Sequence, residues 1–271
     1  MRLCLLVCAV LFLSAVLLPG AAPRQAPASV AQGAVIGPAV EIHPPPENHR
    51  FPLDETYVYQ ADWRLWNAGL VTLTINATSG PQMHVSGTAT SSGVVSVLYP
   101  VRDRFQAVFD RRTFCSESIA KHTEEGFRAR DTLINFNYQR AVSVLDETNL
   151  KTSQTKHQEK AIPACVTDVL SALYYARSLP LVPDATYGFP LNDGGDTVNV
   201  KVRVEAREQV KVPAGTYKTI RISPEAAQGL LKDKGKIWVW YSDDDQRIPV
   251  QMRSRMFWGT LTFRLVRIDK K

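Results

Sequence analysis

The sequence has little histidine and little cysteine, and this scarcity limits the chemistry that the protein can perform. Its 271 residues include only five histidines and four cysteines. The histidines are scattered, and no two of them have the spacing of zinc ligands. They are His43, His49, His84, His122 and His157. The sequence also lacks a Gly-x-Ser-x-Gly elbow and a phosphate-binding loop. We therefore expect no catalytic residues, no metal site and no cofactor.

Long hydrophobic runs are missing as well, except at the beginning of the chain. Residues 3–18 carry no charge, follow Arg2 and precede Gly20, Ala21 and Ala22. This pattern is typical of a secretory signal peptide, with an uncleaved anchor helix as the alternative. We expect a signal at residues 1–22, cleavage between 22 and 31, and a periplasmic or secreted protein. No later segment approaches the roughly 20 apolar residues of a membrane span.

The segment after the signal differs from the rest of the chain in composition. Residues 23–50 are rich in Pro, Ala and Gln, and HPPPENH lies near their end. Such a composition favours a flexible or polyproline-like linker, so we expect a single β domain at residues 51–271. The net charge of +6 would suit anionic lipid or polysaccharide, although simple solubility explains it equally well. No basic cluster indicates nucleic-acid binding.

Two cysteines remain when the signal is removed. Cys4 and Cys8 belong to the signal, whereas Cys115 and Cys165 lie in the β domain. In an oxidising compartment, two remaining cysteines predict one disulfide, and two separate buried thiols are the alternative. A nucleophilic Cys165 with His157 as its base is a third interpretation, which we find weaker than the other two.

Most of the domain alternates apolar and polar residues with the period of a β-strand. In residues 57–65, Tyr57, Tyr59 and Ala61 share one face with Trp63, while the polar residues take the other. The segment DTVNVKVRVEAREQV repeats this pattern, and KIWVWYS is apolar on both faces. Short turns separate the segments. The sequence therefore predicts a large antiparallel sheet, which must twist and curl around something.

One segment has the spacing of a helix instead. TDVLSALYYARSLP has no charge between residues 169 and 176, and Pro180 ends it. Thr167 or Asp168 would cap its first turn, and this explains Asp168 and Ser171 better than catalysis does. A helix that is apolar almost all round is embedded in a membrane or covered by protein, and this one is too short to span. We expect a helix at about 167–178 inside the curled sheet.

Several motifs in this order resemble a known family. They are YQADWRLWNAGL, with Tyr59, Trp63 and Gly69; TDVLSALYYAR; VPAGTYKTIRI; and IWVWYSDDDQRIPV, followed by Gly259. Together they resemble the exported bacterial family called Domain of Unknown Function 3108 over about residues 55–268. The resemblance implies an envelope protein of Gram-negative-type bacteria and no particular reaction. Its fold would be similar to the periplasmic lipoprotein carriers, in which an antiparallel half-barrel encloses a helix and holds acyl chains.

The aromatic residues are the best candidates for ligand contacts, because aromatic-lined concave sites commonly hold lipid or sugar. Core packing is the alternative explanation for them. The candidates are Trp63, Trp66, Tyr174, Tyr175, Trp238 and Trp240. We expect a non-enzymatic envelope protein that binds an apolar or amphipathic ligand, with lipid or another envelope protein as its partner and no nucleic acid. The alternatives are an interaction module with a filled core and, less well supported, an envelope glycan hydrolase.

Overall fold

The computed structural model describes residues 40–64, 66–226, 235–256 and 259–270. The predicted signal and the first part of the predicted linker lie outside these residues. The described strands are β1 (Glu55–Trp63), β2 (Trp66–Ala77), β3 (Gln82–Ser91), β4 (Arg102–Asp110), β5 (Ser116–Glu125), β6 (Arg128–Asn137), β7 (Val142–Asn149), β8 (Thr155–Ala161), β9 (Thr186–Asp193), β10 (Asp196–Val212), β11 (Gly215–Ala226), β12 (Lys236–Ser242), β13 (Pro249–Met256) and β14 (Gly259–Lys270). The described helices are α1 (Gly93–Leu98) and α2 (Val169–Ser178).

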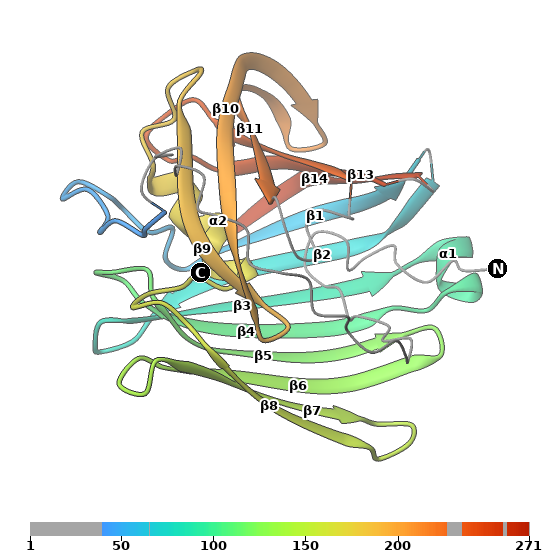
Figure 1. Cartoon of the computed structure of the whole chain (residues 1–271). Coiled ribbons are helices and arrows are strands. Elements are labelled where there is room, and N and C mark those ends of the chain that lie inside the picture. Colours follow the sequence, from blue (N-terminus) through green and yellow to red (C-terminus); the bar gives the residue numbers. More distant parts are fainter. Residues whose placement is uncertain (1–39, 65, 227–234, 257–258, 271) are drawn as a thin grey trace, which may run out of the picture.

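All described strands belong to one antiparallel sheet, which confirms the predicted fold class. Their order is β8-β7-β6-β5-β4-β3-β2-β1-β14-β13-β12-β11-β10-β9, so β1 and β14 pair in the middle of the sheet. The edge strands β8 and β9 are neighbours in sequence, and α2 is the helix between them. Figure 1 shows β9, β10 and β11 turned over α2, with β3–β8 extending away from it.

The sheet is open, but its two edges approach each other at one place. Lys160 of β8 forms an ion pair with Asp196 of β10, and Ser143 Oγ donates to the carbonyl of Gly195 at 3.5 Å. The edge strand β8, TKHQEKA, is mostly exposed and charged. Charged edge strands resist pairing with a second chain, so this edge is protected from aggregation.

Strand alternation determines which side chains form the core. On β10, Val200, Val202 and Val204 are buried, while Lys201 and Arg203 between them are exposed. The same parity on the other strands produces one continuous apolar cluster on the inner face. The predicted inward positions therefore agree with the core of the structure, because a strand can bury only every second residue on one face.

The predicted helix is present as α2, and Asp168 is its cap. Asp168 Oδ1 accepts hydrogen bonds from the backbone N–H groups of Leu170, at 2.8 Å, and Ser171, at 3.1 Å. Its Oδ2 accepts from Ser116 Oγ at 2.6 Å and from Ser171 Oγ. Thr167 donates its hydroxyl to the Pro190 carbonyl instead. The carboxylate thus satisfies the first turn of α2 and ties the helix to β5.

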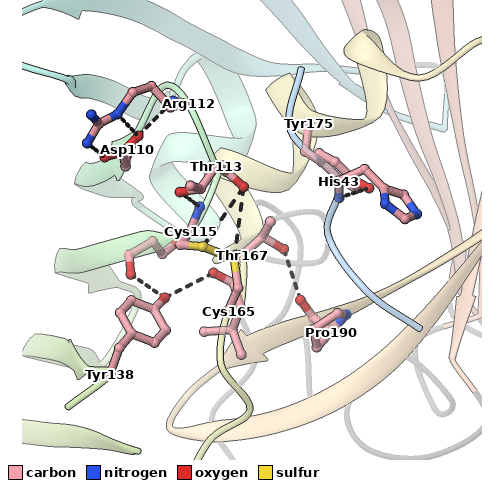
Figure 2. The surroundings of a disulfide bond; sticks show 12 residues. His43, Asp110, Arg112, Thr113, Cys115, Tyr138, Cys165, Thr167, Tyr175 and Pro190 are labelled. Carbon is pink, nitrogen blue, oxygen red and sulfur yellow. Dashed lines mark hydrogen bonds and ion pairs between the residues drawn. A yellow bond between two sulfur atoms is a disulfide. The ribbon is translucent and has the colours of Figure 1, made fainter. Parts of the chain in front are cut away.

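A disulfide between Cys115 and Cys165, as the cysteine count predicted, holds the segment before α2 (Figure 2). Next to it, the Ser116 N–H donates to the Val166 carbonyl at 2.8 Å. The Tyr138 hydroxyl donates to the Ser116 carbonyl at 2.6 Å. These bonds fix the start of α2 to the beginning of β5, so the position of the helix does not depend on apolar packing alone.

The described end of the predicted linker lies against the domain. The backbone N–H of His43 donates to the Tyr175 hydroxyl at 3.2 Å, as Figure 2 shows. The ring of His49 lies 4.7 Å from that of Phe51 and 5.8 Å from that of Phe114. Residues 40–50 therefore contact the α2 region, and the predicted division at residue 51 stays a prediction.

Helix α1 is a short element that the sequence did not predict. It connects β3 to β4 at one end of the sheet, and Val95 is its one buried residue. Within the described residues, neither helix has the length and hydropathy needed to cross a bilayer.

Candidate functional site

An apolar cavity of about 110 Å³ lies between α2 and the inner face of the sheet. Strand β2 and the strands β9–β14 line it together with α2. The lining residues are Val71, Leu73, Val169, Leu170, Ala172, Leu173, Ala176, Phe189, Leu191, Val200, Val202, Ile222, Pro224, Ile237, Val239, Tyr241, Met252 and Phe263. The Tyr241 hydroxyl donates to the Leu173 carbonyl at 2.7 Å. Since that hydroxyl is already bonded, the walls favour apolar groups.

The cavity exists because α2 presents small residues toward the sheet. Ala172 and Ala176 are four positions apart, so they lie on the same face of the helix. Val169, Leu173 and Pro224 also line the space, but they are only partly buried. These partly buried residues mark the entrance of the cavity, which lies beside the first two turns of α2 and the strand β11.

The size of the cavity limits what it can hold. An engineered apolar cavity of about 150 Å³ is large enough to bind benzene, and this cavity is somewhat smaller, at about 110 Å³. The rest of the interior around α2 is filled by buried aromatic side chains, including Tyr57, Tyr59 and Tyr174. The space fits the end of an acyl chain and is too small for a whole one.

A buried cation, Arg177, lies next to the cavity. It follows Ala176, the last residue of α2 that lines the cavity. Arg177 is 5% exposed, and its Nη2 donates to the Gln246 carbonyl. Its Nε and Nη1 have no hydrogen-bond partner among the described residues, and neither does the buried Tyr174 hydroxyl. A buried charge normally has a partner of opposite charge, because isolated burial is costly. The Arg177 guanidinium is thus able to accept an anionic group.

The electrostatics of this region follow from the same two causes, burial and the Arg177 charge. Burial, and then the coulombic effect of Arg177, lowers the pKa of His49 to about 4. Burial raises the pKa of Tyr59, Tyr174 and Tyr241 above its ordinary value, so these hydroxyls stay protonated. His49 and these three tyrosines, on which the Arg177 charge acts, are therefore neutral near neutral pH.

None of the six aromatic residues proposed from the sequence lines the cavity. Trp238 and Trp240 point to the outer face, opposite to Tyr241, where their ring nitrogens donate to Glu205 at 3.2 Å and Glu208 at 2.7 Å. The cation of Lys236 lies 5.1 Å from the ring centre of Trp238, and that of Arg253 lies 5.4 Å from that of Trp240. These contacts occupy both indoles with protein groups.

The other four candidates lie at two places: Trp63 and Trp66 face each other across the β1–β2 ladder, and Tyr174 and Tyr175 are neighbours on α2. Tyr174 and Tyr175 project from sides of α2 that do not line the cavity, and the Tyr175 ring packs 4.9 Å from Phe189. Trp63 is partly buried near the end of β1, and Trp66 is exposed at the start of β2. Tyr174 thus lies near Arg177 with an unpaired hydroxyl, and Tyr175 contacts Phe189, which lines the cavity.

Sequence reasoning missed the residues that shape the cavity. The pair Ala172 and Ala176 had a usable signal, since two small residues on one face of an apolar helix leave room beside it. Arg177 directly follows the uncharged stretch 169–176, and its burial had no signal in the sequence. Among the described residues, no group of His, Cys, Asp and Glu side chains has the arrangement of a metal site.

The fold resembles that of a solved protein of unknown function. The beta-barrel-like protein of domain of unknown function DUF1849 from Brucella abortus superposes with a TM-score of 0.56 and 9% identity, over 86% of this chain and 99% of that one. At this identity the likeness concerns the fold alone.

Two further solved structures show weaker likeness. A protein of Bacteroides fragilis, described as exported and as having a YmcC-like fold, gives a TM-score of 0.35 at 9% identity, over 86% of this chain and 100% of that one. The hypothetical protein CT021 of Chlamydia trachomatis gives 0.37 at 9% identity, over 82% and 89%. These TM-scores support no conclusion.

The family is established by sequence. No curated protein matches the chain. The model of the family described as "protein of unknown function (DUF3108)" matches residues 58–266, which is most of the chain. This confirms the predicted resemblance, and the chain belongs to the DUF3108 family.

Proposed function

We propose that this chain is exported to the cell envelope and binds an apolar or amphipathic ligand without catalysing a reaction. The acyl chain of a lipid or lipoprotein is the ligand class that fits best. The observation that carries the proposal is the apolar cavity beside α2, which is partly open at Val169, Leu173 and Pro224. Apolar walls remove methylene groups from water, which favours binding by roughly 0.8 kcal/mol per buried CH₂ group.

The buried Arg177 supports an amphipathic ligand rather than a plain hydrocarbon. Its helix neighbours Leu173 and Ala176 line the cavity, and so does Tyr241, on whose hydroxyl the Arg177 charge acts. A carboxylate or phosphate would provide the charge that Arg177 lacks among the described residues. Because the cavity holds only a chain end, a longer insertion requires α2 to move.

A binding experiment with a matched pair of variants tests this proposal. Ala176→Phe fills the cavity, whereas Ala164→Phe adds the same side chain at an exposed position before α2. We expect a fluorescent long-chain fatty acid to bind the wild type and Ala164→Phe equally, and to bind Ala176→Phe at least tenfold more weakly. Thermal unfolding confirms that each variant is folded. Equal binding by Ala176→Phe would refute the cavity as the site.

An interaction module with a filled core is the second candidate function. The small volume of the cavity and the buried tyrosines around α2 favour it. Mass spectrometry of the protein isolated from cells separates the two functions. Acyl species that are extracted together with the protein support ligand binding, whereas an extract free of them, together with absent fatty-acid binding, supports the interaction module.

A further inference from the structure

The exposed hydrophobic residues of this protein are concentrated at one end of the sheet. Six of the eleven exposed large hydrophobic residues in the described part lie on or directly beside four connections there: β1–β2, β3–β4 with α1, β5–β6 and β7–β8. They are Trp66, Val94, Val97, Leu98, Phe127 and Leu150. We call this set the exposed rim. Figure 1 shows α1 and the β5–β6 and β7–β8 turns together at the right-hand end of the sheet.

Backbone hydrogen bonds join the connections of the exposed rim into one surface. The Ser92 N–H donates to the Ala68 carbonyl at 3.0 Å and links α1 to β2. The Gly126 N–H donates to the Pro100 carbonyl at 2.8 Å, and the Leu150 N–H donates to the Ala129 carbonyl at 2.9 Å. The apolar side chains are therefore held at a single supported end of the sheet, and their exposure is not that of independent loops.

The exposure is extreme for such side chains. Phe127 is 94% exposed at the tip of the β5–β6 turn, and Val97 is 82% exposed on α1. The opposite ends of the same strands differ: the turns at residues 78–81, 111–115 and 138–141 contribute no exposed large hydrophobic residue. Grouped apolar exposure of this kind marks an interaction site, whereas single exposed residues need no explanation.

Basic residues accompany the apolar ones. A hollow of about 280 Å³ lies between the connections, and Arg102, Arg128 and Lys151 line it. None of the three forms an ion pair within the described residues. Glu124 is the acid of the lining, and its carboxylate contacts His122 at 3.2 Å. The hollow therefore offers an excess of positive charge to a partner.

We propose that the exposed rim docks on the surface of an anionic lipid bilayer. Aromatic and aliphatic side chains at the tips of the rim would enter the headgroup region, and Arg102, Arg128 and Lys151 would contact lipid phosphates. This charge complementarity selects a bilayer over a second copy of the chain. A two-fold pair through the rim would bring the same positive hollows face to face, where they repel.

Vesicle co-sedimentation tests the proposal, with the protein recovered from the envelope of the expressing cell, so that every variant carries the same N-terminus. The probes are vesicles of phosphatidylglycerol with phosphatidylcholine, and vesicles of phosphatidylcholine alone. We expect the wild type to prefer the anionic vesicles and to dissociate as salt is added. Equal binding to both vesicle types would overturn the role of the basic hollow.

Two rim variants locate the contact. Replacing Val97 and Phe127 with Ser should weaken binding on the order of tenfold or more, because two apolar anchors are lost. Replacing Arg102, Arg128 and Lys151 with Gln should weaken it roughly a hundredfold and remove the salt dependence. Binding as tight as that of the wild type in both variants would overturn the proposal.

Matched controls remove the same groups elsewhere. The triple change Arg111→Gln, Arg112→Gln and Arg140→Gln deletes three exposed charges from the opposite end, and Leu53→Ser with Val182→Ser deletes two exposed apolar groups. We expect both controls to bind like the wild type. If a rim variant instead changes the oligomeric state and leaves vesicle binding intact, the rim is an interface between copies and the proposal fails.

Fatty-acid binding measured without vesicles should be unchanged in the rim variants. The docking proposal and the proposed ligand-binding function can therefore fail separately.

Discussion

The two helices of this protein have a similar apolar composition, but they lie in opposite environments. Both are short and rich in apolar residues: α1 reads GVVSVL and α2 reads VLSALYYARS. Eight of the ten residues of α2 are buried, whereas α1 buries only Val95. Apolar composition alone therefore does not determine burial. The difference follows from where each helix is attached to the sheet.

The attachment of α2 is specific, and that of α1 is weak. Helix α2 lies between the edge strands, has a fully bonded cap at Asp168 and follows the disulfide at Cys165. Helix α1 sits at one end of the sheet, and its cap residue Ser92 makes no side-chain cap bond. An apolar helix that its own fold covers is part of the core, and an uncovered one needs a partner.

A charge introduced on each helix gives the largest expected difference between them. Leu170 is 1% exposed on α2, whereas Val97 is 82% exposed on α1. We expect Leu170→Asp to lower the free energy of unfolding by about 5 kcal/mol, because it buries an unpaired carboxylate and removes packing. Val97→Asp should change it by less than about 0.5 kcal/mol. Urea denaturation measures both values, and similar losses would show that α1 is also part of the core.

Removing the disulfide tests the covalent part of the α2 attachment. Cys115 and Cys165 are 50 residues apart. In the chain-entropy model a loop of this length contributes about 4 kcal/mol, so we expect Cys115→Ser with Cys165→Ser to lose about that amount. Unfolding of the wild type in reductant should show the same loss. A double variant as stable as the wild type would mean that Asp168 and the packing hold α2 unaided.

The fold was largely predictable from the sequence because its rules are local. Period-two alternation identified the inner faces of strands such as β10, and the uncharged stretch at 169–176 identified α2. Helix α1 escaped prediction because six residues cannot establish a period of 3.6. Its three valines also favour strands. The pairing of β1 with β14 joins residues far apart in the chain, which local patterns do not specify.

The candidate site was much less predictable. Alternation showed that Trp238 and Trp240 share one face of β12 and that Ile237, Val239 and Tyr241 share the other. It could not show which face is inside, and the cavity lies on the tyrosine side. The burial of Arg177 depends on the distant turn that contains Gln246. Such long-range contacts decide which residues form the site, and a single sequence does not record them.

Removing the cap of each helix should give an intermediate effect. Asp168→Ala deletes four hydrogen bonds to a buried carboxylate, two of them from backbone N–H groups of α2. We expect a loss of about 3 kcal/mol, which combines a lost cap with donors left unpaired. Ser92→Ala on α1 should cost less than about 0.5 kcal/mol, since no cap bond is lost. Thermal unfolding measures both, and equal losses would contradict the assigned caps.

The end of α2, unlike that of α1, should give a smaller effect on stability, and this effect depends on pH. The last turn of α2 contains Arg177, whereas that of α1 has no basic residue. Burial, together with Arg177, lowers the pKa of His49 from its ordinary value near 6.5 to about 4. Between these values the unfolded chain binds a proton that the folded chain excludes, so stability should fall as the pH drops from about 6.5 to 4.

In His49→Gln this part of the decline should disappear, and Arg177→Met should reduce it. Removal of the exposed His157 by His157→Gln is the control. Denaturation midpoints measured from pH 7 to pH 4 provide the comparison, and identical slopes in His49→Gln and the wild type would show that the pKa of His49 is not lowered in the folded protein.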